Sequence, residues 1–324
     1  MHDTAPLKKD DKIQGLPAIP ASARAGVVAI GNFDGVHKGH QKLIATARAL
    51  ADAQARPLVV LTFDPHPRRY FQPDAPPFLL TMPAVKEALL KKCGVDHVVH
   101  VPFDAALAGL SAEAFIADVL TGFLDARHVV VGHDFAFGKR RGGSVDTLRQ
   151  AKAFGVDVQE AVCGKDDSVY ASSRIRAHIA AGAFDAAERL LGWPWCMVGP
   201  VLHGDKRGRE TGFPTANQDM GLYVRPPFGI YAVRVQVAGE TIWRHGAASL
   251  GLRPMFAVDS PILETHIFDF DRDIYGKKLR VQPVKFLRPE AVFDGLDALT
   301  AQIRQDCLNA RAVLKLAENE EGLR

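Results

Sequence analysis

Short apolar runs rich in β-branched residues alternate with segments of helical periodicity through the first part of the chain. Two parallel strands need a crossover connection, usually a helix, so this alternation favours a parallel sheet. The expected fold is an α/β domain with a Rossmann-like parallel sheet at residues 25–192, after a loose tail at 1–24. We predict strands at 26–30, 57–63, 97–101 and 127–131 and helices at 38–53, from Thr81 to Gly94 and at 111–120.

The pattern of apolar and polar residues changes near residues 192–197, where we expect the domain boundary. Just before it, Ser172 or Ser173 is expected to cap a helix ending at Gly182, and Asp185 a helix ending at Gly192. Beyond it, long runs with alternating polarity predict an antiparallel β-barrel domain at 197–324 that ends in a helix within 291–317. The alternating runs lie at 228–237, 241–248, 262–270 and 279–286.

Length, charge and cysteine usage limit the class of protein. At about 150 residues per domain, a chain of 324 residues holds two domains. A formal net charge of +3 gives no indication of nucleic acid as the main partner, and no apolar run is long enough to span a membrane. The four cysteines are scattered, and the N-terminus lacks the apolar stretch of a signal peptide, so we expect a cytoplasmic location. The oligomeric state is left open.

The run Gly31-Asn32-Phe33-Asp34-Gly35-Val36-His37-Lys38-Gly39-His40 joins the first strand to the first helix. Ligands of open parallel sheets bind at the carboxyl ends of strands, where the helix N-terminus suits a phosphate chain. His37 and His40 share one helical face, and Gly39 lets a nucleotide approach the backbone. Two imidazoles there could stabilise charge that grows on a phosphate during transfer. A His-x-x-His pair also occurs as surface decoration or as half of a metal site, but no third ligand at a recognisable spacing supports zinc.

Three further segments are expected near the same strand ends. Thr62 to Arg69 follows the second strand, Val131 to Arg141 follows a later one, and Tyr170 to Arg176 opens a helix with hydroxyls and arginines that suit anionic oxygens. A turn with an N-cap and a solvated basic face is the alternative for each.

The segment from Leu202 to Asn217 is the most informative part of the second half. Glycines recur at 204, 208 and 212 with basic residues between them, so the loop can cradle phosphates through its backbone N–H groups. Thr215 and Asn217 offer neutral oxygen ligands that suit magnesium bound to ATP. A solvated basic hairpin is the alternative.

Glu264 lies on an otherwise mostly apolar face of the run 262–270. A carboxylate in such a position is costly to bury unless it is paired or functional, so Glu264 is a candidate general base for a substrate hydroxyl. A glutamate of an edge strand that faces water is the alternative.

Together these motifs resemble the prokaryotic bifunctional riboflavin kinase/FMN adenylyltransferase (FAD synthetase) family over residues 26–310. The specific strings are Gly-x-Phe-Asp-Gly-Val-His-x-Gly-His at 31–40, Gly-Phe-Pro-Thr-Ala-Asn at 212–217 and Leu-Glu-Thr-His at 263–266. The resemblance implies a nucleotidyltransferase domain followed by a six-stranded kinase barrel.

The resemblance also implies roles for individual residues. ATP in the first domain would contact Gly31, Phe33, Asp34, Gly35, His37, Gly39, His40, Ser172, Ser173, Arg174 and Arg176. The flavin there would contact Asp64, Pro65, His66, Pro67, Asp134, Phe135 and Phe137. In the barrel, ATP would contact Gly204, Lys206, Gly208, Gly212 and Pro214, the metal would contact Thr215 and Asn217, and Glu264 would act as the base. Three positions depart from the family pattern: Ala171, Ser249 and Met255 stand where a hydroxyl residue, Asn and Thr are usual.

The predicted function is therefore ATP-dependent phosphorylation of riboflavin to FMN, followed by adenylyl transfer from a second ATP to give FAD and pyrophosphate. The required cofactor is Mg²⁺, bound as MgATP, and the partners are small-molecule substrates. One alternative is a monofunctional adenylyltransferase whose barrel binds flavin only for regulation. Another is a non-enzymatic RNA-binding protein that uses the basic loops, which would show salt-dependent binding without turnover.

Overall fold

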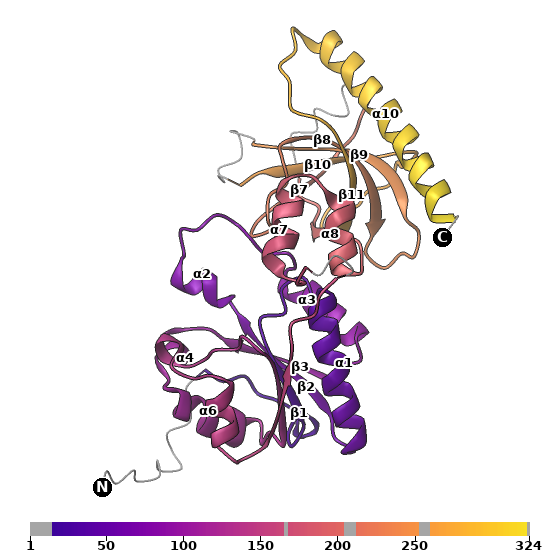
Figure 1. Cartoon of the computed structure of the whole chain (residues 1–324). Coiled ribbons are helices and arrows are strands. Elements are labelled where there is room, and N and C mark those ends of the chain that lie inside the picture. The colour runs from indigo at the N-terminus through magenta and orange to yellow at the C-terminus, as the bar shows by residue number, and fades with distance from the viewer. Residues whose placement is uncertain (1–14, 165–167, 204–211, 253–259, 323–324) are drawn as a thin grey trace. The chain divides into compact units, whose positions relative to one another are not determined.

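The computed structural model of the chain describes residues 15–164, 168–203, 212–252 and 260–322 (Figure 1). Contacts between Cα atoms divide the chain into two compact units, Met1–Pro76 with Pro83–Tyr170 and Pro77–Met82 with Ala171–Arg324. The division falls after Tyr170, so the two helices that precede the barrel group with the second unit. The expected extents of the two functional domains, 25–192 and 197–324, stay predictions.

The first unit is built on the parallel sheet that the sequence predicted. Its five strands have the order β3-β2-β1-β4-β5, and all their pairings are parallel. The strands are β1 (Val27–Ile30), β2 (Leu58–Asp64), β3 (His97–Pro102), β4 (His128–Gly132) and β5 (Gly155–Gln159). The side chains of β1 are buried without exception because helices cover both faces of the sheet, which explains its uninterrupted apolar sequence.

One face of this sheet is covered by α1 (Lys38–Ala53), whose bounds are those predicted. Its buried stripe consists of Leu43, Ile44, Ala47 and Ala51. The other face packs on the core formed with α4 (Ala105–Gly109), α5 (Ala112–Ala114), the π-helix η2 (Phe115–Phe123) and α6 (Val145–Gln150) (Figure 1). The remaining helical segments are η1 (Ala21–Ala23), α2 (Pro67–Phe71), α3 (Pro83–Lys92) and η3 (Lys139–Arg141).

The second unit contains the predicted antiparallel barrel. Its six strands have the order β6-β11-β8-β9-β10-β7. They are β6 (Met197–Pro200), β7 (Ala216–Asp219), β8 (Gly229–Val237), β9 (Arg244–Gly251), β10 (Ile262–Ile267) and β11 (Lys278–Arg288). A bridge between Leu202, just after β6, and Asn217 in β7 brings the two ends of the sheet together and nearly closes the barrel.

Helices precede and follow the barrel strands along the sequence. The C-terminal helix α10 (Leu296–Gly322) confirms the predicted helical tail and packs on β8 and β9, with Ala310 and Leu314 buried. The helices α7 (Ser172–Ala180) and α8 (Phe184–Leu191) precede the barrel and pack on each other.

Two capping predictions were wrong. The N-cap of α7 is Ala171, so Ser172 and Ser173 are already helical, and the N-cap of α8 is Ala183, which places Asp185 in the first turn. Asp185 still lies where a carboxylate interacts favourably with the helix dipole. Gly192 does end α8, with a left-handed φ of 83°.

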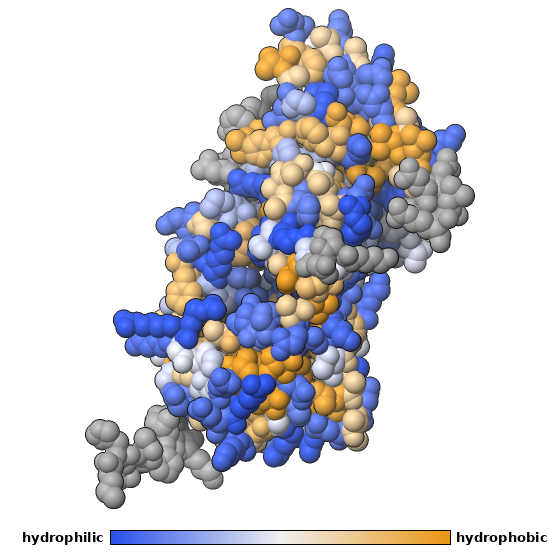
Figure 2. Space-filling model, in the orientation of Figure 1, coloured by the Kyte–Doolittle hydropathy of each residue, from blue (hydrophilic) through white to orange (hydrophobic). Residues whose placement is uncertain are grey.

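On the face drawn in Figure 2, hydrophobic residues gather in several groups with hydrophilic residues between them. Among the residues that the structure describes, no helix has both the length and the hydrophobicity needed to cross a membrane.

Candidate active sites

The first candidate site lies at the carboxyl edge of the parallel sheet. The strands β2, β1 and β4 are neighbours and parallel, so Asp64, Gly31 and Gly132, which end or follow them, lie at the same edge. The strand order reverses between β1 and β4, and open α/β sheets bind ligands at such a switch point. The sheet therefore brings three of the four predicted segments to one edge.

The turn between β1 and α1 is tightly held in a strained conformation. Phe33 and Val36 have positive φ angles of 49° and 43°, which are uncommon for residues with a side chain and rarest for a β-branched one. Both side chains are buried. The Val36 N–H donates to the Phe33 carbonyl at 3.1 Å, and Nε2 of the Gln41 side chain donates to the Val36 carbonyl at 2.9 Å. Strain of this kind persists only where the surroundings fix the backbone, as at many functional sites.

His37 and His40 stack at the start of α1. Their ring centroids are 3.7 Å apart, and the rings of Phe33 and His40 make a T-shaped contact. His37 is the N-cap of α1, and its Nδ1 accepts a long hydrogen bond of 3.4 Å from the His40 backbone N–H. With Nδ1 as the acceptor, the neutral His37 ring carries its proton on Nε2, which is then a hydrogen-bond donor. Both histidines thus lie at the helix end that favours anions.

Gly39 has a packing role that the sequence analysis did not foresee. A Cβ atom at this position would lie 3.1 Å from Cε1 of His37 and 3.3 Å from Cβ of Tyr170. Glycine therefore leaves room for the stacked His37 ring.

A buried lysine near these strand ends was missed by the sequence analysis. Lys86 in α3 donates from Nζ to the hydroxyl of Thr62 at 2.9 Å and to the carbonyl of Asn32 at 3.3 Å. A signal was present, because Lys86 lies four residues before the buried Leu90 and so shares its helical face.

The predicted flavin-binding segments are placed at the same edge but differ in exposure. Asp64, Pro65 and Asp134 are exposed, whereas His66 and Pro67 are half-buried where α2 begins. The ring of Phe135 stacks on that of Phe137, and Phe137 is itself buried against Phe115 in the core.

The segment Ser172–Arg176 belongs to the second unit, so its convergence with the first site stays a prediction. Arg176 donates from Nε to the Phe78 carbonyl at 2.7 Å and lies over the Phe78 ring. Ala171, the departure from the family pattern, provides no side-chain cap for α7.

The second candidate site lies on the barrel, where strand register brings predicted residues together. Glu264 in β10 is paired directly with Asn217 in β7 and, on its other side, with Ser249 in β9. Side chains directly opposite in antiparallel strands lie on the same face with Cβ atoms about 5 Å apart. The three side chains are half-buried, whereas the neighbouring Leu263 and Thr265 are buried on the opposite face. A row across three strands thus contains Glu264 as the predicted base, Asn217 as a predicted metal ligand, and Ser249, which departs from the family pattern.

Asn217 has an unsatisfied side-chain oxygen. Its Oδ1 is buried and has no hydrogen-bond partner among the residues that the structure describes. Buried polar atoms are normally paired, so an orphaned neutral oxygen beside a carboxylate fits a cation site. Thr215 precedes β7 by one residue and is half-buried. Pro214 and Gly212 are exposed, and Gly204, Lys206, Gly208 and Met255 lie outside the described residues.

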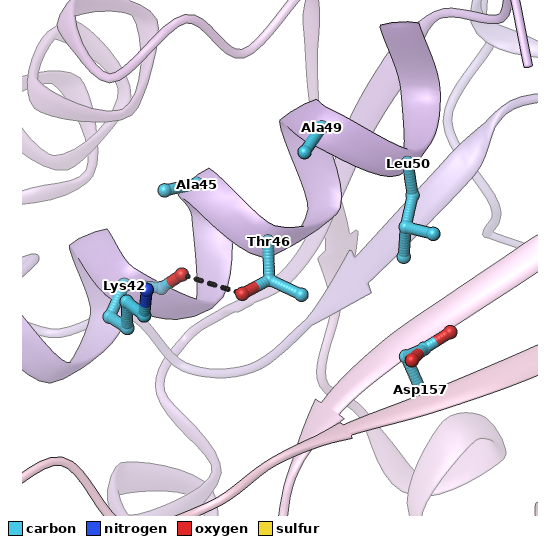
Figure 3. Close-up of a pocket in the computed structure, with 6 residues that line it drawn as sticks. All are labelled: Lys42, Ala45, Thr46, Ala49, Leu50 and Asp157. Atoms are coloured by element: carbon cyan, nitrogen blue, oxygen red, sulfur yellow. Dashed lines mark hydrogen bonds between the residues drawn. The ribbon is translucent and has the colours of Figure 1, made fainter. Parts of the chain in front are cut away.

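A hollow of about 440 Å³ lies elsewhere in the first unit, beside α1 (Figure 3). Lys42, Thr46 and Leu50 line it from α1, and Asp157 lines it from β5. None of the predicted site residues contributes to it.

Two family models match the chain in the order that the motifs predicted. Residues 19–174 match FAD synthetase and residues 191–314 match riboflavin kinase. The bifunctional riboflavin kinase/FMN adenylyltransferase of Escherichia coli strain K12 is 38% identical, with 94% of this chain and 98% of that protein covered. The protein of that name from Pseudomonas fluorescens is 39% identical, with 93% and 97% covered. The chain therefore belongs to the bifunctional riboflavin kinase/FMN adenylyltransferase family.

A solved structure has the same fold. The crystal structure of a macrolide-efflux protein from Streptococcus pneumoniae matches with a TM-score of 0.77 and 31% identity, covering 91% of this chain and 95% of that one. The predicted combination of an α/β domain with a barrel and C-terminal helix is confirmed.

Proposed function

We propose that this chain makes FAD from riboflavin in two steps, with the kinase step on the barrel and the adenylyl-transfer step at the carboxyl edge of the parallel sheet. Family membership supports the two activities. The observation that supports the residue assignments is the row of Asn217, Glu264 and Ser249 across three barrel strands, since it joins a carboxylate to an unsatisfied neutral oxygen.

In the kinase step, Glu264 accepts the proton of the terminal ribityl hydroxyl of riboflavin. The hydroxyl oxygen forms a bond to the γ-phosphorus of ATP as the bond from that phosphorus to the bridging oxygen breaks, and ADP leaves. A half-buried carboxylate on a partly apolar surface can hold this proton while the product leaves.

Thr215 and Asn217 would hold the magnesium ion of MgATP in this site. When bound, the ion offsets the charge of the phosphates. The protein's part is to present Asn217 Oδ1, which lacks another partner among the described residues, and the adjacent Thr215 hydroxyl. If this is so, Asn217→Ala should raise the magnesium concentration needed for half-maximal FMN formation, and an unchanged magnesium titration would count against the assignment.

In the adenylyl-transfer step, an oxygen of the FMN phosphate attacks the α-phosphorus of ATP. The bond from that phosphorus to pyrophosphate breaks, and no covalent enzyme intermediate is needed. Negative charge grows on the departing pyrophosphate. His37, His40 and the N-terminal N–H groups of α1 stabilise this charge, with Nε2–H of His37 as one donor. The protein mainly positions the reactants and neutralises charge.

Chromatographic separation of flavins after incubation with riboflavin, ATP and magnesium tests the proposal. FMN should form first and FAD should follow. Flavin binding without FMN formation would instead favour the alternative of a regulatory barrel, and FAD formation from supplied FMN would then still report on the first unit. A cytoplasmic location, the absence of nucleic acid as a partner and the use of Mg²⁺ stay predictions.

A further inference from the structure

A small polar network is buried behind the turn that carries His37 and His40. Lys86 is 6% exposed, and its Nζ donates to the Thr62 hydroxyl at 2.9 Å and to the Asn32 carbonyl at 3.3 Å. The Thr62 hydroxyl, fully buried in β2, donates to the same Asn32 carbonyl at 3.2 Å. Asn32 lies between Gly31 and Phe33, at the base of the strained turn. The network therefore ties that turn to the neighbouring strand and to α3.

The network places a cation among two carboxylates at the proposed site. Burial lowers the pKa of Lys86, and the nearby carboxylates of Asp34 and Asp64 oppose this shift. Asp34 is 3% exposed and belongs to the strained turn, while Asp64 ends β2. Two negative charges at an edge where a triphosphate is to bind would repel it unless a cation offsets them.

The other titratable groups of this neighbourhood come from β3 and from α3. His100 in β3 is paired with Thr62, and burial together with Lys86 lowers its pKa, against the influence of Glu87 and Asp64. Lys86 therefore lies within the electrostatic range of both Asp34 and Asp64.

We propose that Lys86 is a positioning residue for adenylyl transfer, which holds the Asn32–Asp34 turn against β2 and offsets the charges of Asp34 and Asp64 where the phosphates of ATP bind. The inference rests on the proposed function of the first unit. A buried lysine that only fills space would affect folding but would leave the chemistry of the folded protein unchanged.

The test uses the full chain, in which riboflavin phosphorylation by the barrel reports on the integrity of each preparation. In Lys86→Met, kcat for FAD formation from supplied FMN and ATP should fall about 10–100-fold, as expected when a reacting group is misplaced. The rate of FMN formation should stay within about twofold of the wild type. Lys92→Met, on the exposed side of the same helix, is the matched control and should leave both rates unchanged.

A pH profile separates positioning by charge from a structural role. The protonated form of Lys86 is lost as the pH rises through its lowered pKa, so the wild-type rate of FAD formation should fall at a lower pH than an ordinary lysine, with a pKa of about 10.4, would give. Lys86→Met should lack this decline. Thr62→Val keeps the shape of the side chain but removes the hydroxyl, and it is the second test if Lys86→Met does not fold. Its kcat for FAD formation should also be lower than that of the wild type.

Two results would overturn the inference. In the first, Lys86→Met keeps the wild-type kcat for FAD formation and the wild-type decline of this rate at high pH. In the second, Lys86→Met and Thr62→Val lose both activities and thermal stability in parallel. Failure of the proposed function would look different, because the wild type itself would not make FAD from supplied FMN, or His40→Ala would make it at the normal rate.

Discussion

Nδ1 of His266 lies 2.8 Å from the carbonyl oxygen of Pro214. A carbonyl can only accept, so His266 donates from Nδ1 and joins β10 to the segment that leads into β7. The rings of Phe213 and His266 also make a T-shaped contact. The histidine that follows Glu264 by two residues thus fixes the backbone just before Thr215.

Substitution of His266 by alanine should weaken ATP binding in the kinase step. The loss of a hydrogen bond worth about 1 kcal/mol corresponds to about a fivefold rise in KM for ATP. Asparagine can present an N–H near the position of Nδ1, so His266→Asn should retain much of the wild-type KM. Steady-state kinetics of FMN formation gives both values. Equal KM values for ATP in the wild type and in His266→Ala would show that the contact does not position the site.

Glu264→Gln should stop FMN formation while leaving FAD formation from supplied FMN intact. The amide keeps the size of the side chain but cannot take the hydroxyl proton, and loss of a general base costs about 10²–10⁴-fold in rate. Both steps can be followed by flavin chromatography on one preparation. A rate of FMN formation close to that of the wild type would show that Glu264 is not the base.

The sequence was sufficient for the elements whose apolar pattern is strong. The helix at 38–53 and the buried strands on either side of it were predicted nearly residue for residue. The strands β5, β6 and β7 were missed, because Gly-Val-Asp-Val-Gln, Met-Val-Gly-Pro and Ala-Asn-Gln-Asp are short and interrupted by glycine, proline or polar residues. Pairing with β4, β11 and β10 makes these segments strands, and such tertiary context is not contained in local propensity.

The candidate sites show a similar division. The sequence indicated Glu264 and Asn217 one by one, but their adjacency depends on the register between β10 and β7. Lys86 was overlooked because a lysine in a helix usually faces solvent, and only the packing of α3 places it beside Thr62.

His40→Ala should abolish FAD formation, with FMN accumulating from riboflavin. The His40 ring stacks on His37 at the N-terminus of α1. Its loss removes one proposed donor and also removes a contact that holds the His37 ring in place. Loss of one such donor costs about 10²–10³-fold in kcat. His97→Ala is a matched control, because His97 begins β3 and therefore lies at the opposite edge of the sheet. FAD output from His40→Ala that equals that of His97→Ala would refute the assignment.

An ion pair between Arg288 in β11 and Asp306 anchors the C-terminal helix α10 to the barrel. Asp306 in α10 is 4% exposed and accepts hydrogen bonds from Nε of Arg288 at 2.9 Å and from Nη2 of Arg288 at 2.6 Å. Removing Asp306 leaves the charge of Arg288, whose side chain is 22% exposed, without its carboxylate partner, so Asp306→Ala should lower the free energy of unfolding of the barrel by about 1.5–3 kcal/mol. Asp297→Ala, at the exposed start of the same helix, should change it by less than about 0.5 kcal/mol.

Urea denaturation followed by tryptophan fluorescence measures this change selectively. The three tryptophans of the chain, Trp193, Trp195 and Trp243, all belong to the second compact unit, so the signal reports on the barrel and its helices. The midpoint of Asp306→Ala should shift to lower urea concentration, whereas that of Asp297→Ala should coincide with the wild type. Asp306 forms hydrogen bonds with Arg288 and Gln302, and neither is a proposed site residue, so FMN formation by folded Asp306→Ala at low temperature should persist. A midpoint equal to that of Asp297→Ala would mean that apolar packing of α10, through Ala310 and Leu314, anchors the helix without the ion pair.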